Sequence, residues 1–261
     1  MKQMNEKLRA LLEVFIFTSI IIISFAVIEI TIAYPYAPWI KKTAMIIIAL
    51  LFIQVKGKRR EYGLIPSNAK LSAKWSLIIL LTFVIPAALS VIFFDGKIGG
   101  FSLLLEFIWF MIFTGFSEEL AFRGYIQSRL NESFTKTYKK FMGFKVEWHE
   151  GTLIAGALIF GPIHLINAID FKTGEVCIDA TLILIVIFAS FFGVLFGVIR
   201  EISGDVMVCS TLHGVFDFVA ISLLARTNMG SLYWIPIAIS FFVFFGFMFE
   251  RLIEDFQSRL V

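Results

Sequence analysis

Long apolar runs alternate with short polar stretches along this chain of 261 residues. A helix needs about 20 mostly apolar residues to cross the hydrocarbon core of a bilayer, and seven runs approach or reach that length. An eighth contains Lys41 and Lys42 near its start, where lysine side chains can extend to the membrane interface beside Trp39. The predicted spans are Leu11–Ala33, Trp39–Val55, Trp75–Phe94, Phe101–Phe116 with a polar continuation, Thr152–Ile169, Ala180–Ile199, Val206–Ala225 and Ser231–Phe249.

Basic residues are concentrated in every second connection between these spans. They gather in residues 2–9, 56–74 and 129–145, whereas the connections Asp95–Gly100 and Asp170–Asp179 contain one lysine each. Because cytoplasmic loops carry the excess of Lys and Arg, this pattern predicts that both termini are cytoplasmic. The alternation holds only if the lysine-containing run is a span. The longest polar stretch, Asn131–Glu150, is expected to hold an amphipathic piece in the cytoplasm.

The composition indicates the same class of protein. Hydrophobic residues make up 59% of the chain and the mean hydropathy is +0.88, whereas soluble domains are roughly half apolar. The net charge of +3 is too small to suggest nucleic acid as a partner, so the bilayer is the expected surrounding. Cys177 and Cys209 form no CxxC pair and indicate neither a disulfide framework nor a structural zinc site.

These observations predict an all-α polytopic transmembrane bundle of about eight spans. The first apolar run is too long for a signal-peptide core and lacks a small-x-small cleavage pattern, so we expect it to be retained as a helix. We expect a single integral membrane domain over residues 1–261, multi-pass, in the cell membrane if the source is prokaryotic.

Ionisable side chains inside the predicted spans concentrate in three places. An ionised side chain at mid-membrane costs about 2.5–3.5 kcal/mol, so such residues persist where they pair, face the bundle interior or take part in chemistry. The first place is Glu118–Glu119, with Arg123 four residues after Glu119, the favourable order for an ion pair. The second is Phe160–His164. The third is His213–Asp217, whose spacing of four puts both side chains on one helix face.

Each place also has a structural interpretation when it is taken alone: a solvated helix end, a hydrogen-bonded core histidine, or an interhelical polar clamp. Polar insertions in three different helices together favour a water-activating site. Such a site needs a general base, a group that positions the water and donors for an oxyanion. Glu118, His164, His213 and Asp217 supply these groups if their helices converge.

The depth of these residues sets a condition on that convergence. Counted from the cytoplasmic ends, His164 lies about 20 Å along its helix, whereas Glu118 lies near the inner end of its own. The two meet only if the fifth helix begins in the cytosol or the fourth continues well past Arg123. The third histidine, His149, is expected to be solvated.

Two further acids, Glu29 and Glu106, also fall within predicted spans. Each stands alone in the sequence, and neither is assigned a role.

The ordered series Glu-Glu-x-x-x-Arg, Phe-x-x-x-His and His-x-x-x-Asp resembles the motifs of the CAAX-protease and bacteriocin-processing family, which includes the Ras-converting prenyl-protein endopeptidases. The series lies within residues 101–225, each motif in its own predicted span. The resemblance implies an intramembrane endopeptidase that hydrolyses a peptide bond with a glutamate-activated water. It implies that Glu118 is the general base, that His164 helps to hold the water, and that His213 stabilises the oxyanion.

The same resemblance implies that Glu119 and Arg123 form a supporting pair and that Phe160 is a packing residue. Enzymes of the prenyl-protein branch have asparagine where this chain has Asp217, and an ionised aspartate cannot donate to an oxyanion. We therefore expect Asp217 to orient His213 and favour its charged form, leaving His213 as the donor. Peptide or protein substrates with and without a prenyl group both remain candidates.

Two alternatives stay open at this point. Two histidines with carboxylates are a plausible zinc set, although no local HExxH-type chelate is present, so no cofactor is favoured. Activity that survives exhaustive chelation would exclude the zinc enzyme. The second alternative is a non-enzymatic scaffold or a carrier that uses the polar cluster as a proton relay. A carrier should show flux that depends on a pH gradient, and it should not lose all function in Glu118→Gln.

Overall fold

The computed structural model of the protein describes residues 5–94, 96 and 100–258. Lys2, Asp95 and Lys97, which contributed to the charge pattern of the connections, lie outside the described residues. Within those residues, eight helices are long and apolar enough to cross a membrane, as predicted. They are Glu6–Thr31, Tyr36–Lys56, Ala69–Phe93, Gly100–Asn131, Glu150–Ala168, Ala180–Ser203, Met207–Arg226 and Trp234–Gln257.

Four of these spans are single α-helices: α1 (Glu6–Thr31), α2 (Tyr36–Lys56), α3 (Ala69–Phe93) and α9 (Ala180–Ser203). The other four combine α-helical segments with wider π-helical or tighter 3-10 turns. Their α-helical segments are α4 (Gly100–Ile108), α5 (Ser117–Glu119) and α6 (Ser128–Asn131) in the fourth span, α7 (Glu150–Leu153) and α8 (Gly161–Ile163) in the fifth, α10 (Met207–Asp217) in the seventh, and α11 (Trp234–Val243) and α12 (Phe249–Gln257) in the eighth.

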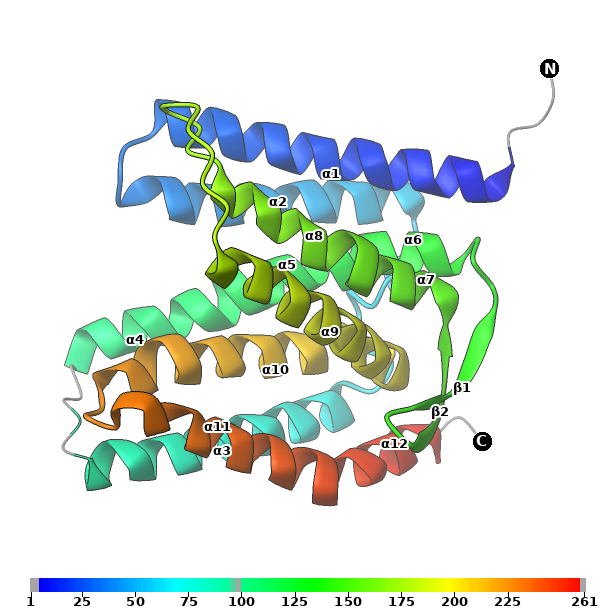
Figure 1. The fold of residues 1–261 in the computed structure, drawn as a ribbon. Coiled ribbons are helices and arrows are strands. Elements are labelled where there is room, and N and C mark those ends of the chain that lie inside the picture. The colour runs from blue at the N-terminus through cyan, green and yellow to red at the C-terminus, as the bar shows by residue number, and fades with distance from the viewer. Residues whose placement is uncertain (1–4, 95, 97–99, 259–261) are drawn as a thin grey trace.

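The helices form a bundle in which the three motifs lie at the centre (Figure 1). Helices α1 and α2 pack together at one edge, and α3 packs with α11 at the opposite edge. The fourth, fifth and seventh spans, which carry the motifs, lie between these pairs together with α9. Large apolar side chains such as Phe15, Ile92 and Phe242 are exposed on the outside, as expected where lipid rather than water surrounds the protein.

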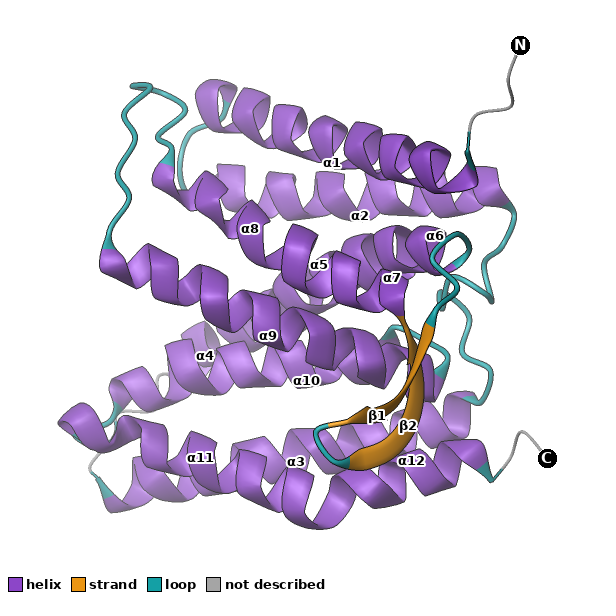
Figure 2. Cartoon of the chain, turned by 45° about the vertical axis from the view of Figure 1, so that its right-hand side comes forward, coloured by secondary structure: helices purple, strands orange, loops and turns teal. Residues whose placement is uncertain are grey.

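The first and last described helices begin and end on the same side of the bundle. A β-hairpin lies on that side too, close to α12 (Figure 2). An even number of spans requires this arrangement. Which side faces the cytoplasm stays a prediction from the distribution of Lys and Arg.

The hairpin is formed by the polar segment for which an amphipathic piece was expected. Strand β1 (Thr137–Phe141) pairs antiparallel with β2 (Phe144–His149). Val146 and Trp148 are buried while their neighbours along β2 are more exposed, so the strand is amphipathic. His149, which was expected to be solvated, is partly exposed and also has a partner. Its side chain is only 38% exposed, and Nδ1 lies 2.6 Å from Oε2 of Glu201, which fixes the hairpin to α9.

Glycines allow the motif-bearing helices to approach closely. A Cβ added at Gly115 would lie 2.6 Å from the Ser210 carbonyl oxygen, and one at Gly214 would lie 2.8 Å from that of Phe110. A side chain at either position would therefore push α10 away from the fourth span. Gly193 and Gly197 of α9 likewise allow neighbouring helices to pack closely, as small residues do at interfaces between membrane helices. At Gly193 an added Cβ would lie 2.6 Å from the Gly156 carbonyl oxygen.

Candidate functional site

The length of the fourth span determines the depth of the acidic pair. The predicted apolar run Phe101–Phe116 and its polar continuation form one helix that reaches Asn131. Glu118 is therefore 13 residues from that end, on the order of 20 Å along the axis. His164 is 14 residues from the start of the fifth span at Glu150, a similar depth. The fourth helix thus continues past Arg123, as convergence of Glu118 and His164 requires.

All four predicted catalytic residues line one cavity of about 710 Å³. Glu118 comes from α5, His164 from the end of the fifth span, and His213 and Asp217 from α10. The rest of the wall is mainly aromatic and aliphatic, with Phe160, Phe188, Phe192, Phe196, Phe216 and Trp234 among its members. The cavity therefore combines an apolar volume with ionisable groups gathered in one place.

Glu119 and Arg123 form the predicted supporting pair. The Arg123 Nη1 atom lies 2.9 Å from Glu119 Oε1, and both side chains are almost fully buried. Arg123 also donates to the Gly193 carbonyl oxygen at 3.1 Å, and its guanidinium lies 4.0 Å from the ring centroid of Phe160. Phe160 is buried and makes a cation–π contact with Arg123, and its role as a packing residue stays a prediction.

The imidazole of His213 lies among three carboxylates. Its Nδ1 atom is 2.8 Å from Glu119 Oε1, and its Nε2 atom is 3.5 Å from Asp217 Oδ2 and 3.9 Å from Glu118 Oε2. Both ring nitrogens face acceptors, so a doubly protonated ring can donate on both sides. The sequence predicted the neighbour Asp217 but not Glu119. Through that contact, Glu119 both pairs with Arg123 and holds the His213 ring.

His164 is oriented by its own helix. Its Nδ1 atom lies 2.7 Å from the carbonyl oxygen of Phe160. A carbonyl oxygen only accepts, so Nδ1 carries the proton in this hydrogen bond. In the neutral ring, Nε2 then has a free lone pair. His164 can therefore accept a hydrogen bond or a proton within the cavity that it shares with Glu118.

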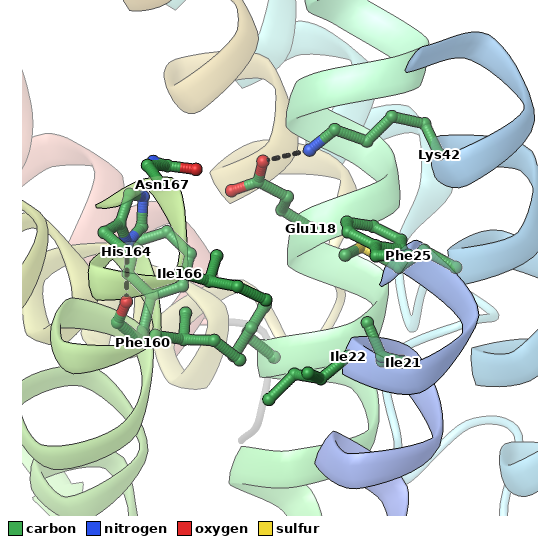
Figure 3. Close-up of a pocket in the computed structure, with 12 residues that line it drawn as sticks. Ile21, Ile22, Phe25, Lys42, Glu118, Phe160, His164, Ile166 and Asn167 are labelled. Carbon is green, nitrogen blue, oxygen red and sulfur yellow. Dashed lines mark hydrogen bonds and ion pairs between the residues drawn. The ribbon is translucent and has the colours of Figure 1, made fainter. Parts of the chain in front are cut away.

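Lys42 forms an ion pair with Glu118 that sequence analysis missed. Its Nζ atom contacts Oε1 of Glu118 (Figure 3), and both side chains are largely buried. Lys42 therefore does not extend to the interface, and Lys41 does not stand free either, because its Nζ lies 2.6 Å from Oε2 of Glu29. The signal was present in the sequence: an intramembrane lysine needs a partner as much as an intramembrane acid does.

The other acid left without a role, Glu106, also has partners. It forms an ion pair with Arg226 and accepts a hydrogen bond from Ser222. Sequence position alone could not show this pairing, because the fourth and seventh spans must first pack together.

The sequence left a zinc site at these residues open. In the part of the chain that the structure describes, no three His, Cys, Asp or Glu side chains are grouped to hold a metal ion. The ammonium of Lys42 lies at the Glu118 oxygen where a cation would bind. A zinc ion at Glu118 would have to displace that ammonium, and the absence of a resident metal stays a prediction.

Comparison with known proteins gives one family. A family model described as type II CAAX prenyl endopeptidase Rce1-like matches residues 100–219. No curated protein and no solved structure matches the chain. The matched segment begins at the start of α4 and includes Glu118, His164, His213 and Asp217.

Proposed function

Because this chain belongs, through residues 100–219, to the Rce1-like type II CAAX prenyl endopeptidase family, we propose that it hydrolyses a peptide bond inside the membrane with a water activated by Glu118. The family supports a CAAX-type intramembrane protease. The observation that carries the proposed mechanism is the convergence of Glu118, His164 and His213 on one largely apolar cavity.

In this mechanism, the Glu118 carboxylate removes a proton from a water molecule that Nε2 of His164 helps to hold. The water oxygen forms a bond to the carbonyl carbon of the substrate, and the carbonyl oxygen becomes an oxyanion. The C–N bond then breaks, and the proton held by Glu118 passes to the leaving amine. General bases of this kind contribute about 10²–10⁴-fold to the rate.

His213 supplies the positive hydrogen-bond donor for the oxyanion. Glu119 accepts from Nδ1 and holds the ring, so that Nε2 faces the cavity. Asp217 orients the same ring from the other side and does not itself donate. A donor directed at the oxyanion in a water-poor site is worth about 10²–10³-fold in kcat, because nothing competes for the developing charge.

The apolar cavity favours a substrate that enters from the membrane. Phe188, Ile221 and Trp234 line the cavity and are also exposed on the outside of the bundle, where lipid would lie. We propose a peptide or protein substrate whose hydrophobic part, prenylated as the family name suggests, occupies this volume while the scissile bond reaches Glu118.

The direct test is an assay of purified protein in lipid bilayers with a farnesylated CaaX peptide and its unprenylated twin. Release of the C-terminal tripeptide from the prenylated peptide alone is the expected result. Cleavage of both peptides would retain the protease and remove the prenyl requirement. Cleavage of neither, by a protein shown to be folded, would contradict the CaaX substrate.

Two substitutions of Asp217 are expected to show whether its role is to orient the His213 ring or to supply a negative charge. Asp217→Asn keeps a polar side chain of the same shape beside the His213 ring, with Nε2 still able to turn toward the oxyanion, so turnover should stay within about tenfold of the wild type. Asp217→Ala frees the ring on that side, and kcat should fall about 100-fold, the size of effect expected when a catalytic group is misplaced by 1 Å. Steady-state kinetics of the two variants decide this. Equal losses in both would mean that the negative charge itself is required.

Removal of metal ions is expected to leave activity unchanged. We propose that no resident metal takes part, because an ammonium cation lies where a metal would contact Glu118. Prolonged treatment with EDTA and phenanthroline, followed by assay in metal-depleted buffer, tests this. Loss of activity that returns on adding zinc would favour the metalloenzyme instead.

A further inference from the structure

We propose that Lys42 is a positioning residue that holds the catalytic carboxylate of Glu118 through one oxygen and leaves the other oxygen for the attacking water. This inference rests on the proposed function, since it gives Lys42 a role in the reaction that Glu118 performs. Lys42 lies in α2, outside the segment 100–219 that matches the family model.

The two oxygens of Glu118 face different partners. Oε1 is paired with the Lys42 ammonium, whereas Oε2 lies 3.9 Å from Nε2 of His213. That separation is too long for a hydrogen bond but leaves Oε2 next to the donor that would face the oxyanion. A carboxylate gripped at Oε1 can rotate little, so the direction of the Oε2 lone pairs is fixed before substrate binds.

The other cations near the site have partners of their own. Arg123 is paired with Glu119, and Lys41 with Glu29. Among the described residues, the ion-pair partners of Glu118 are Lys42 and His213. Loss of the Lys42 ammonium would therefore leave Glu118 with a single partner, one that the reaction itself uses.

Lys42 also lies at the junction of two further cavities. One, of about 230 Å³, is lined by Lys42, Glu118, His164 and Asn167 (Figure 3). The next, of about 650 Å³, shares Lys42 and Asn167 and extends to Asp170 and Lys172 in the loop on the side opposite the hairpin. A small polar cation can therefore reach the position of the Lys42 ammonium without passing through the apolar cavity.

The chain offers a matched control in the neighbouring residue. Lys41 has a similar environment, since it also pairs with a glutamate of another helix and its side chain is 24% exposed, against 18% for Lys42. Its partner Glu29 does not line the cavity that holds the histidines. Lys41→Ala therefore removes a lysine and its ion pair from the same helix without touching Glu118.

The test compares peptide hydrolysis by wild type, Lys42→Ala and Lys41→Ala in bilayers, with and without added ethylammonium. In Lys42→Ala we expect kcat to fall about 100-fold with KM unchanged, because the carboxylate is misplaced while the substrate cavity is intact. Ethylammonium should raise the kcat of Lys42→Ala at least about tenfold. Ethanol, a neutral molecule of similar size, should not raise it. Lys41→Ala should retain wild-type kcat and show no response to the amine.

Three outcomes would overturn the inference. They are wild-type kcat in Lys42→Ala, a loss that the amine does not restore, and an equal loss in Lys41→Ala. If Lys42→Ala does not fold, Lys42→Arg carries the test. It keeps a cation at the position, so turnover well above the Glu118→Gln level supports the role and turnover at that level contradicts it. A wild-type protein without hydrolytic activity would instead refute the proposed function, so the two failures are distinguishable.

Discussion

Replacing Glu118 with glutamine is expected to reduce kcat by about 10³-fold while the protein stays folded. The amide has nearly the same shape as the carboxylate but cannot take a proton from water. It can still accept a hydrogen bond from Lys42 through its oxygen, so the helix packing around it should persist. The measurement is the rate of peptide release by purified protein in bilayers, with the melting temperature recorded in parallel.

Glu29→Gln is the matched control for that substitution. Glu29 is also an intramembrane glutamate paired with a lysine of α2, but it lies in α1, away from the two histidines. Its turnover should equal that of the wild type. Full activity in Glu118→Gln would remove Glu118 from the reaction. An equal loss in both variants would indicate that charge within the membrane, rather than general-base chemistry, is what activity requires.

Replacing Arg123 with methionine is expected to give the largest loss of stability. Arg123 is 1% exposed and is the ion-pair partner of Glu119, whose side chain is fully buried. Removing one member of a buried ion pair costs about 3–5 kcal/mol. For a chain of this size, that corresponds to a fall in melting temperature of roughly 10 °C. His213, which also lies near Asp217 and Glu118, would then be the remaining cationic partner of Glu119. Activity should fall too, because Glu119 holds His213.

A second variant separates charge from packing in this prediction. Glu119→Gln combined with Arg123→Met removes both charges, so the double variant should be more stable than Arg123→Met alone. Arg226→Met is the control at a partly exposed pair, with Glu106, where we expect a smaller loss of stability than in Arg123→Met. Thermal unfolding in one detergent compares all three. A double variant less stable than Arg123→Met would show that packing and the Gly193 hydrogen bond matter more than the charge.

The number of spans was predictable because each one follows from local sequence. A run of about 20 apolar residues is stable in a bilayer only as a helix whose backbone groups are internally bonded. The Glu119–Arg123 pair was equally predictable, since residues four apart share a helix face. The position at which the fourth span ends was not predictable from the sequence. The sequence left open how far the helix runs past Arg123, because the residues that follow are polar, yet Arg123, Gln127 and Arg129 are buried in the bundle.

Contacts between distant segments were the part that sequence could not supply. Lys42 and its partner Glu118 are 76 residues apart, and His213 and Glu119 are 94 residues apart. Neither contact follows from helical periodicity. Each depends on how closely the spans pack, and that depends in turn on glycines such as Gly115 and Gly214. The chemistry-bearing residues could be named from sequence, whereas the Lys42 and Glu119 contacts that hold them required the fold.

The proposed role of Glu118 is to activate water for attack on a peptide bond. The most direct measurement is mass spectrometry of the products formed from a farnesylated CaaX peptide in water enriched in oxygen-18. We expect the wild type to place one heavy oxygen in the new carboxylate of the prenylated fragment, and Glu118→Gln to form essentially no product. Labelled product formed by Glu118→Gln at the wild-type rate would contradict this role of Glu118.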